Sequence, residues 1–289
     1  MDSNVNNIQD DGLPIEKIKF HSTEKHNIIA YYAKMFSTGM KKWQNRVYID
    51  LFAGSGYSKV KGENEIRLGS PLIALAVKDK FSHYIFCEKD EEKINALRSR
   101  VERMNPNENV CFIQGDVNFN IDQVLWKIPK FSSSNNGISF CVVDPYAAST
   151  LNFNSINKLA SNIFVDFLVL IPTHMEFNLF QKDFLYGSRK QDLNNFLGND
   201  DWYEKWLEIQ YKPSSNFGDF ILESFCDEMR KLGFKTEGLK NAKPILHADK
   251  NYTLYYLCFF SKHDLGLVFW KKCLKGTRPQ TYFEFYDET

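Results

Sequence analysis

The sequence predicts an α/β fold built on a doubly wound, mostly parallel sheet, and two observations carry this prediction. Apolar runs of strand length alternate with segments of helical periodicity along most of the chain. The first run, residues 48–51, enters a Gly-x-Gly turn at Gly54 and Gly56, and the next three runs each end in polar side chains. The carboxyl ends of parallel strands share one edge of a sheet, so the turn and the polar clusters are expected to border one ligand crevice.

The strand and helix expectations follow from the same patterns. Buried strands are expected at residues 48–51, 84–87, 110–114, 138–143 and 164–171, and a C-terminal antiparallel hairpin is expected to end with 253–260. Helices are expected at residues 23–38, from Ser70 onward, and at 91–104, 121–128, 217–232 and 265–274. The polar residues 57–68 predict a long loop after the glycine turn.

The domain organisation is expected to be simple. Residues 1–22 predict a disordered N-terminal tail, because the first dozen are polar and acidic without an apolar segment of signal-peptide type. One domain then covers residues 23–289. Within it, the aromatic and charged segment of about 175–211 predicts a helical cap inserted beside the site, where it would help to choose the substrate.

The glycine turn narrows the choice of ligand. A dinucleotide fingerprint would have a third glycine at position 59, which is Lys59, and a P-loop would not continue as Tyr57-Ser58. The looser turn that remains is typical of S-adenosylmethionine sites. The side chains or backbone expected to contact this cofactor at the first strand are Asp50, Phe52, Ala53, Gly54, Ser55 and Gly56. The helix that starts at Ser70-Pro71 is not expected to begin against the turn in the manner that cradles a phosphate, and it leaves Ser70 near the site.

The second and third strand ends supply the other cofactor contacts. Glu88, followed by Lys89, is placed to accept hydrogen bonds from both ribose hydroxyls. Asp116, followed by Val117, is placed to accept from the exocyclic amine of adenine. Each acid on its own is also explained as a helix cap or turn residue. Their occurrence in order at successive strand ends favours a ligand site.

The chain resembles class I S-adenosylmethionine-dependent methyltransferases, and more closely the three-Cys-motif partner (TcmP) family. The similarity runs over roughly residues 23–272, and its most specific parts are Asp50–Gly56 and Gly69–Leu75. Further matching segments are Lys25-His26, Glu88–Asp90, Gly115-Asp116, Asp144–Tyr146, Phe196–Gly198 and Trp202. The resemblance implies a class I methyltransferase sheet, S-adenosyl-L-methionine as cofactor, a partner protein with a three-cysteine motif, and a setting in phage defence or mobile elements. The resemblance implies no particular substrate.

The fourth strand end resembles the motif of methyltransferases that act on amines. In that motif the acid side chain and the proline carbonyl accept hydrogen bonds from the target NH₂, and an aromatic ring stacks on a flipped base. Asp144, Pro145 and Tyr146 are therefore the predicted catalytic residues. The chain has one proline followed by Ala147, so its aromatic residue comes one position early; a tight turn after a strand is the alternative explanation. His26, on the first helix, is expected near the methionine carboxylate or the substrate, with a surface histidine as the alternative.

The composition of the chain limits its partners, its metal content and its location. The 36 basic and 36 acidic residues balance, so the whole chain has no electrostatic signature of nucleic-acid binding. The six cysteines lack metal-binding spacing, which predicts no metal site and a reducing, cytoplasmic location. No apolar run is long enough to predict a membrane span.

Three functions are compatible with these patterns. The first is an S-adenosylmethionine-dependent methyltransferase that acts on an amine nitrogen of a nucleic acid. The second is a cofactor-binding partner subunit without turnover of its own. The third is another nucleotide-binding α/β enzyme such as a dehydrogenase, against which the missing third glycine counts.

Overall fold

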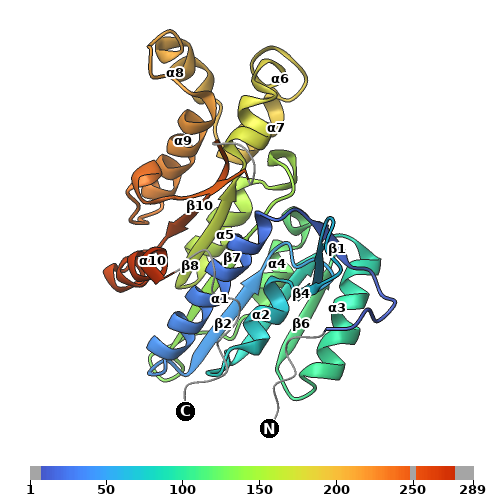
Figure 1. Ribbon diagram of the computed structural model, residues 1–289. Coiled ribbons are helices and arrows are strands. Elements are labelled where there is room, and N and C mark those ends of the chain that lie inside the picture. Colours follow the sequence, from blue (N-terminus) through green and yellow to red (C-terminus); the bar gives the residue numbers. More distant parts are fainter. Residues whose placement is uncertain (1–7, 248–251, 277–289) are drawn as a thin grey trace.

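The computed structural model describes residues 8–247 and 252–276. Its main sheet has seven strands in the order β6-β5-β2-β7-β8-β10-β9 (Figure 1). The strands from β6 to β8 pair in parallel, and β10 is antiparallel to both of its neighbours. The strand bounds are β2 (Asn45–Asp50), β5 (His83–Glu88), β6 (Val110–Gln114), β7 (Gly137–Val143), β8 (Val165–Ile171), β9 (Lys243–Leu246) and β10 (Thr253–Phe260).

Helices cover both faces of this sheet because each strand is apolar on both sides. Buried side chains of one face form a core with α1 (Ser22–Gly39), α2 (Ser70–Ala76), α3 (Glu91–Met104) and α10 (Asp264–Gly276). Those of the other face pack against α4 (Val117–Lys127), α5 (Phe153–Asn162) and α9 (Phe217–Lys231). The strand order reverses at β2, which places the carboxyl ends of β2 and β7 at a topological switch point. The predicted doubly wound fold with a C-terminal antiparallel hairpin is confirmed.

The chain between β8 and α9 forms short helices that stand beyond the carboxyl end of β8 (Figure 1). They are the π-helical turn η2 (Thr173–Asn178), α6 (Gln181–Tyr186), α7 (Lys190–Leu197) and α8 (Trp202–Ile209). Their aromatic residues are largely internal: Phe177, Phe184, Phe196 and Trp202 are fully buried and contact one another or α9. Packing therefore explains most of the aromatic content of this segment.

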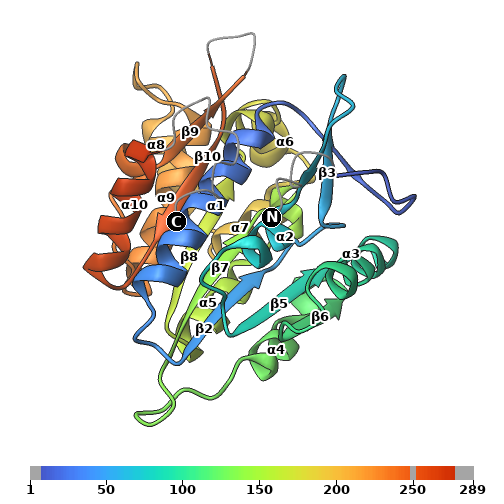
Figure 2. The same ribbon diagram turned by 60° about the horizontal axis from the view of Figure 1, so that its bottom comes forward.

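The predicted loop at residues 57–68 is wrong. The segment is a hairpin of β3 (Tyr57–Val60) and β4 (Ile66–Leu68), and β3 pairs in parallel with β1 (Glu16–Ile18) to make a second, three-stranded sheet. The hairpin forms because Tyr57, Val60, Ile66 and Leu68 are buried although the other residues of the segment are mostly polar. Gly62 at the tip has φ 89°, a conformation that favours glycine. Figure 2 shows β3 projecting beside the edge of the main sheet.

The predicted disordered tail, residues 1–22, is ordered from residue 8 onward. Residues 1–7 lie outside the part of the chain that the structure describes. Residues 8–18, the N-terminal strap, are bound to α3 through Arg100 and end in β1. Arg100 of α3, which is fully buried, donates to the Asp11 carboxylate (2.7 Å) and to the carbonyl oxygens of Pro14 (2.8 Å) and Ser55 (2.6 Å). The hydrogen bond that Arg100 donates to the Asp11 carboxylate holds the pKa of Asp11 well below its ordinary value. A single buried guanidinium thus orders a segment whose composition predicts disorder.

In the residues that the structure describes, no helix has both the length and the apolar character needed to cross a membrane.

Candidate functional site

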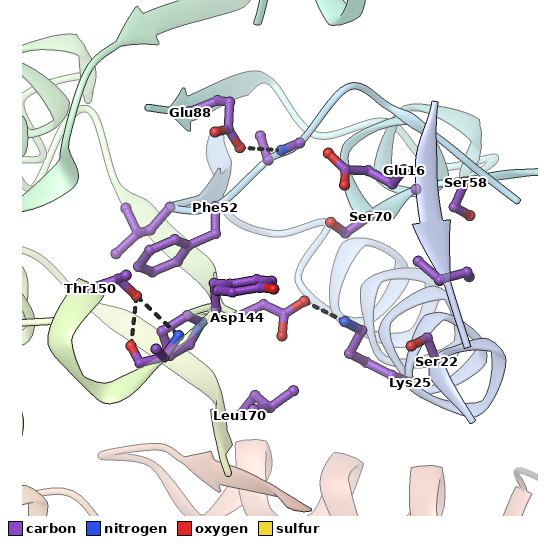
Figure 3. Close-up of a pocket in the computed structure, with 18 of the residues that line it drawn as sticks. Glu16, Ser22, Lys25, Phe52, Ser58, Ser70, Glu88, Asp144, Thr150 and Leu170 are labelled. Carbon is purple, nitrogen blue, oxygen red and sulfur yellow. Dashed lines mark hydrogen bonds and ion pairs between the residues drawn. The ribbon is translucent and has the colours of Figure 1, made fainter. Parts of the chain in front are cut away.

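A cavity of about 1080 Å³ lies at the carboxyl ends of β2, β5, β6 and β7 (Figure 3). Its walls come from the glycine turn, the strap, the start of α1, the loop after β7 and the helical segment after β8. Most of the predicted site residues line it: His26, Phe52, Ala53, Gly54, Gly56, Ser70, Glu88, Lys89, Asp116, Val117, Asp144, Pro145 and Tyr146. The topology therefore brings together residues separated by more than a hundred positions in sequence.

The glycine turn has the geometry that the sequence predicts. Gly54 (φ 63°) and Gly56 (φ 86°) both take left-handed conformations. The Gly54 N–H donates to Oε2 of Glu88 at 2.8 Å, and the Asp90 N–H donates to Oε1 of the same carboxylate at 2.9 Å. A Cβ on Gly56 would come within 2.7 Å of Leu97 Cδ1, so this position also needs glycine for packing. Glu88 is thereby held rigidly at the tip of β5, and each of its oxygens keeps a lone pair for a ligand.

Asp116 serves both as a helix cap and as a wall of the cavity. Its Oδ1 accepts from the Asn118 N–H at 2.9 Å, and its other oxygen pairs with Lys89 at 3.1 Å. This cap starts α4 at Val117, earlier than the predicted residue 121. Asp116 can therefore cap α4 and face a ligand at the same time, so the two explanations of this residue do not exclude each other.

Two predicted cofactor residues lie beneath the cavity wall instead of lining it. Ser55 is fully buried, and its hydroxyl donates to the Tyr57 carbonyl at 3.2 Å. Asp50 is fully buried too; it accepts from the Phe52 N–H at 3.3 Å, and the Tyr48 hydroxyl lies 3.4 Å from its other oxygen. Both side chains shape the turn from below: Asp50 points inward from the last position of β2, and Ser55 points inward from the turn itself.

Burial raises the pKa of Asp50 to about 7, against an ordinary value of 3.8. The hydrogen bonds from Ser70 and Phe52 oppose this shift, and the charge of Asp144 adds to it. Near neutral pH this carboxyl is thus poised between its two protonation states, directly under the glycine turn.

Asp144 lies at the centre of the cavity and forms an ion pair with Lys25, which reaches it from α1 (Figure 3). Lys25 is only 12% exposed and Asp144 25%, so this pair is largely shielded from water. The start of α1 is joined to the end of β7 by this contact. The sequence resemblance included Lys25, but its partner became clear only from the fold.

The loop that carries Pro145 and Tyr146 is held from two sides. The Glu176 carboxylate of η2 accepts from the Ala148 N–H at 2.8 Å and pairs with Arg189. Asn118 of α4 donates to the Thr150 carbonyl at 3.0 Å and accepts from the Asn152 N–H at 2.8 Å. Tyr146, which precedes both anchored positions, is 97% exposed at the cavity mouth.

His26 lines the cavity beside Lys25. Burial, together with the positive charges of Lys25 and Arg67, lowers the pKa of His26 to about 3. The ring is therefore neutral at pH 7 and can act as a hydrogen-bonding group but not as a fixed cation for a carboxylate.

Glu16 is a cavity residue that the sequence analysis missed. It projects from β1 toward the glycine turn, where a Cβ on Gly54 would lie 3.3 Å from Glu16 Oε1, and the same oxygen is 2.9 Å from Lys93 Nζ. Glu16 and Glu88 thus flank Gly54 on two sides (Figure 3). No motif marks Glu16, since it belongs to a polar segment that is positioned by Arg100 and by the pairing of β1 with β3. Glu176 and Arg189 were missed for a similar reason, because only the fold brings η2 to the end of β7.

Comparison with protein-family models and with curated proteins finds no match. Among solved structures, a Legionella pneumophila protein, LPL1258, described by the family model DUF519, is 11% identical with a TM-score of 0.47, covering 82% of this chain and 85% of that one. An O-methyltransferase from Bacillus cereus in complex with SAH is 10% identical with a TM-score of 0.42, covering 87% and 85%. Trm1 from Pyrococcus horikoshii with S-adenosyl-L-methionine is 10% identical with a TM-score of 0.44, covering 91% and 61%. These values are too low to assign an activity, so function has to be inferred from the residues of the site.

The raised pKa of Asp50 makes a prediction about stability. The folded state holds this proton more tightly than the unfolded state, so ionisation of Asp50 costs stability as the pH rises from about 4 to about 7. Asp50→Asn removes this cost. The free energy of unfolding is measured by urea titration for the variant and for wild type. The variant's value minus the wild-type value should increase by up to about 4 kcal/mol as the pH rises from about 4 to about 7. Asp122→Asn, an exposed change on α4, is the control. A difference between Asp50→Asn and wild type that does not vary with pH would contradict the assignment.

Proposed function

We propose that this protein is an S-adenosyl-L-methionine-dependent methyltransferase that transfers a methyl group to an amine nitrogen of a nucleic acid. The observation that carries the proposal is the arrangement around the glycine turn. Two carboxylates, Glu88 and Glu16, flank Gly54, and a third, Asp144, lies farther into the same cavity. Membership of the TcmP family and a role in phage defence stay predictions from the sequence.

The residues of the cavity fit the chemistry of this cofactor. Glu88 is positioned to accept from ribose hydroxyls, and Asp116 and the Phe52 ring to hold the adenine. Glu16 offers a carboxylate for an ammonium group on the other side of Gly54, and Ser70 lies near it (Figure 3). The start of α2 lies against the turn, but the Gly69 N–H at its N-cap donates to the Gly56 carbonyl at 2.7 Å and is not free to bind a pyrophosphate. The cofactor supplies an activated methyl group with a neutral thioether as leaving group.

Orientation of the acceptor is then the main task of the protein. The Asp144 carboxylate and the Pro145 carbonyl are the acceptors available to a target amine in the cavity. Glu176 and Asn118 fix the loop that bears them, so these acceptors are held before the substrate arrives. The Asp144 carboxylate accepts hydrogen bonds from the N–H groups of the amine, and this directs the nitrogen lone pair toward the methyl group.

A nucleobase amine is the acceptor best suited to the rim of the cavity. Tyr146 presents an aromatic face at the mouth, and Phe180 (45% exposed) lines the cavity from the helical segment after β8. An unstacked base could stack on such a ring while its amine reaches Asp144. The cavity volume also exceeds what one small cofactor needs.

The Lys25 ion pair favours a second candidate function. The Lys25 ammonium already donates to Asp144, in the place that a target amine would take. If Lys25 does not withdraw, the protein would bind the cofactor without turnover, as a partner subunit would.

The cofactor assignment predicts a difference between two glutamates. Glu88→Gln should weaken binding of S-adenosylhomocysteine and of 5′-methylthioadenosine alike, because both ligands carry the ribose. Glu16→Gln should weaken the binding of S-adenosylhomocysteine by about tenfold or more. It should leave the affinity for 5′-methylthioadenosine unchanged, since this ligand has no amino-acid group. Titration calorimetry measures all four affinities, with Glu91→Gln on the exposed face of α3 as the matched control. Equal losses for both ligands in Glu16→Gln would contradict its placement.

The function itself is tested at Asp144. Asp144→Ala should lower methyl transfer from radiolabelled S-adenosylmethionine to nucleic acid by about a hundredfold, because the acceptor amine loses its orientation. Its affinity for S-adenosylhomocysteine should stay close to that of wild type. Asp122→Ala is the control for a lost exposed carboxylate. Cofactor binding without transfer in the wild-type protein would support the non-catalytic candidate, and transfer that survives in Asp144→Ala would overturn the catalytic role.

A further inference from the structure

The small sheet next to the cavity carries two lysines on adjacent strands, Lys17 and Lys59, and two more directly after the ends of these strands, Lys19 and Lys61. In the parallel pairing of β1 with β3, Lys17 stands directly opposite Lys59. The pairing continues one step, because the Lys61 N–H donates to the Ile18 carbonyl at 2.9 Å, which brings Lys61 beside Lys19. Lys17, Lys19 and Lys61 are exposed and Lys59 is half-buried. We call these four residues the lysine cluster.

The charge of the lysine cluster is not balanced within the protein. Across residues 8–247 and 252–276, none of the four forms an ion pair, whereas the acidic side chains of the same region are engaged elsewhere. Glu63 and Glu65 both pair with Arg67 (2.7 and 3.0 Å), and Glu16 pairs with Lys93 (2.9 Å). Like charges directly opposite each other on paired strands destabilise a sheet. The ammonium groups of the lysine cluster therefore repel one another, and a bound anion would reduce this repulsion.

The position of the cluster indicates which anion this is. Lys17, Lys19 and Lys61 line the mouth of the cavity that contains Asp144. Exposed aromatic rings lie near them: Phe20 (58% exposed) comes two residues after β1, and Tyr146 lies at the same mouth. Lysines that track a backbone, interleaved with rings on which bases stack, are the features of a surface for single-stranded nucleic acid.

We infer that the lysine cluster binds the backbone phosphates of a single-stranded nucleic acid and leads the strand across the cavity mouth. The inference rests on the proposed function in taking a nucleobase as the acceptor. A base inside a duplex could not reach Asp144, which lies within the cavity and is only 25% exposed, so the bound strand is unpaired at the target. The balanced charge of the whole chain is consistent with this surface, because the positive charge is local.

The test is the salt dependence of binding. A fluorescently labelled single-stranded oligonucleotide is titrated with the full chain over a series of KCl concentrations, and anisotropy gives the affinity. The combined variant Lys17→Gln, Lys19→Gln, Lys61→Gln should weaken binding at low salt by at least about tenfold. It should also reduce the slope of log affinity against log salt by about 2, because each phosphate contact contributes about 0.7 on a single strand. The matched control, Lys42→Gln, Lys127→Gln, Lys130→Gln, removes three exposed lysines away from the cavity and should leave the slope unchanged.

Three results would overturn the inference. One is an unchanged slope in the cluster variant. Another is loss of S-adenosylhomocysteine binding in that variant without oligonucleotide, which would assign the lysines to the cofactor site. The third is binding of the wild type to phosphatidylserine vesicles, lost in the variant, without binding to the oligonucleotide. If the slope changes as expected but no methyl is transferred, the phosphate-binding surface stands and the proposed function fails.

Discussion

The Arg100 guanidinium is the interaction on which the site depends. From one buried position it bonds to Asp11 and Pro14 of the strap and to the Ser55 carbonyl inside the glycine turn, while its charged plane lies 4.0 Å from the Tyr57 ring centre. The turn, the strap and the start of the β3–β4 hairpin are thus fixed to α3 together. Removal of a buried charge from such a network typically costs about 3–5 kcal/mol. The position of Glu16 over Gly54 follows from this anchor.

A second set of constraints holds the chemistry at the end of β7. Glu176 and Asn118 bind the loop after Asp144 at Ala148 and at Thr150, and Lys25 binds Oδ2 of the Asp144 carboxylate itself. The loop is therefore preorganised, whereas the Lys25 contact has to yield to an amine that bonds to Oδ2 of Asp144. Glu176 belongs to a π-helical turn, a feature often found at functional sites.

The sequence predicts the main sheet and the strand-end residues because strong local signals mark them. Apolar runs define β2, β5, β6, β7 and β8, and Gly54, Glu88 and Asp144 follow directly from where those runs end. The strap and the β3–β4 hairpin could not be predicted, since their order comes from Arg100, from the pairing of β1 with β3 and from four buried side chains within mostly polar sequence. Asp50 and Ser55 belong to the predicted motif, yet both side chains point inward, Asp50 because it ends the strand β2 and Ser55 because its hydroxyl donates to the Tyr57 carbonyl.

Hydrogen exchange with and without S-adenosylhomocysteine tests the cofactor site most directly, because it reports on the turn and the strap in one experiment. We expect slower exchange on ligand binding in the segments around Gly54, Glu88 and Asp116, and also in residues 15–18 of the strap, with no change in α8. Protection of the turn without the strap would contradict the role of the strap in cofactor binding. Exchange that is unchanged at every one of these segments would contradict the cofactor site itself.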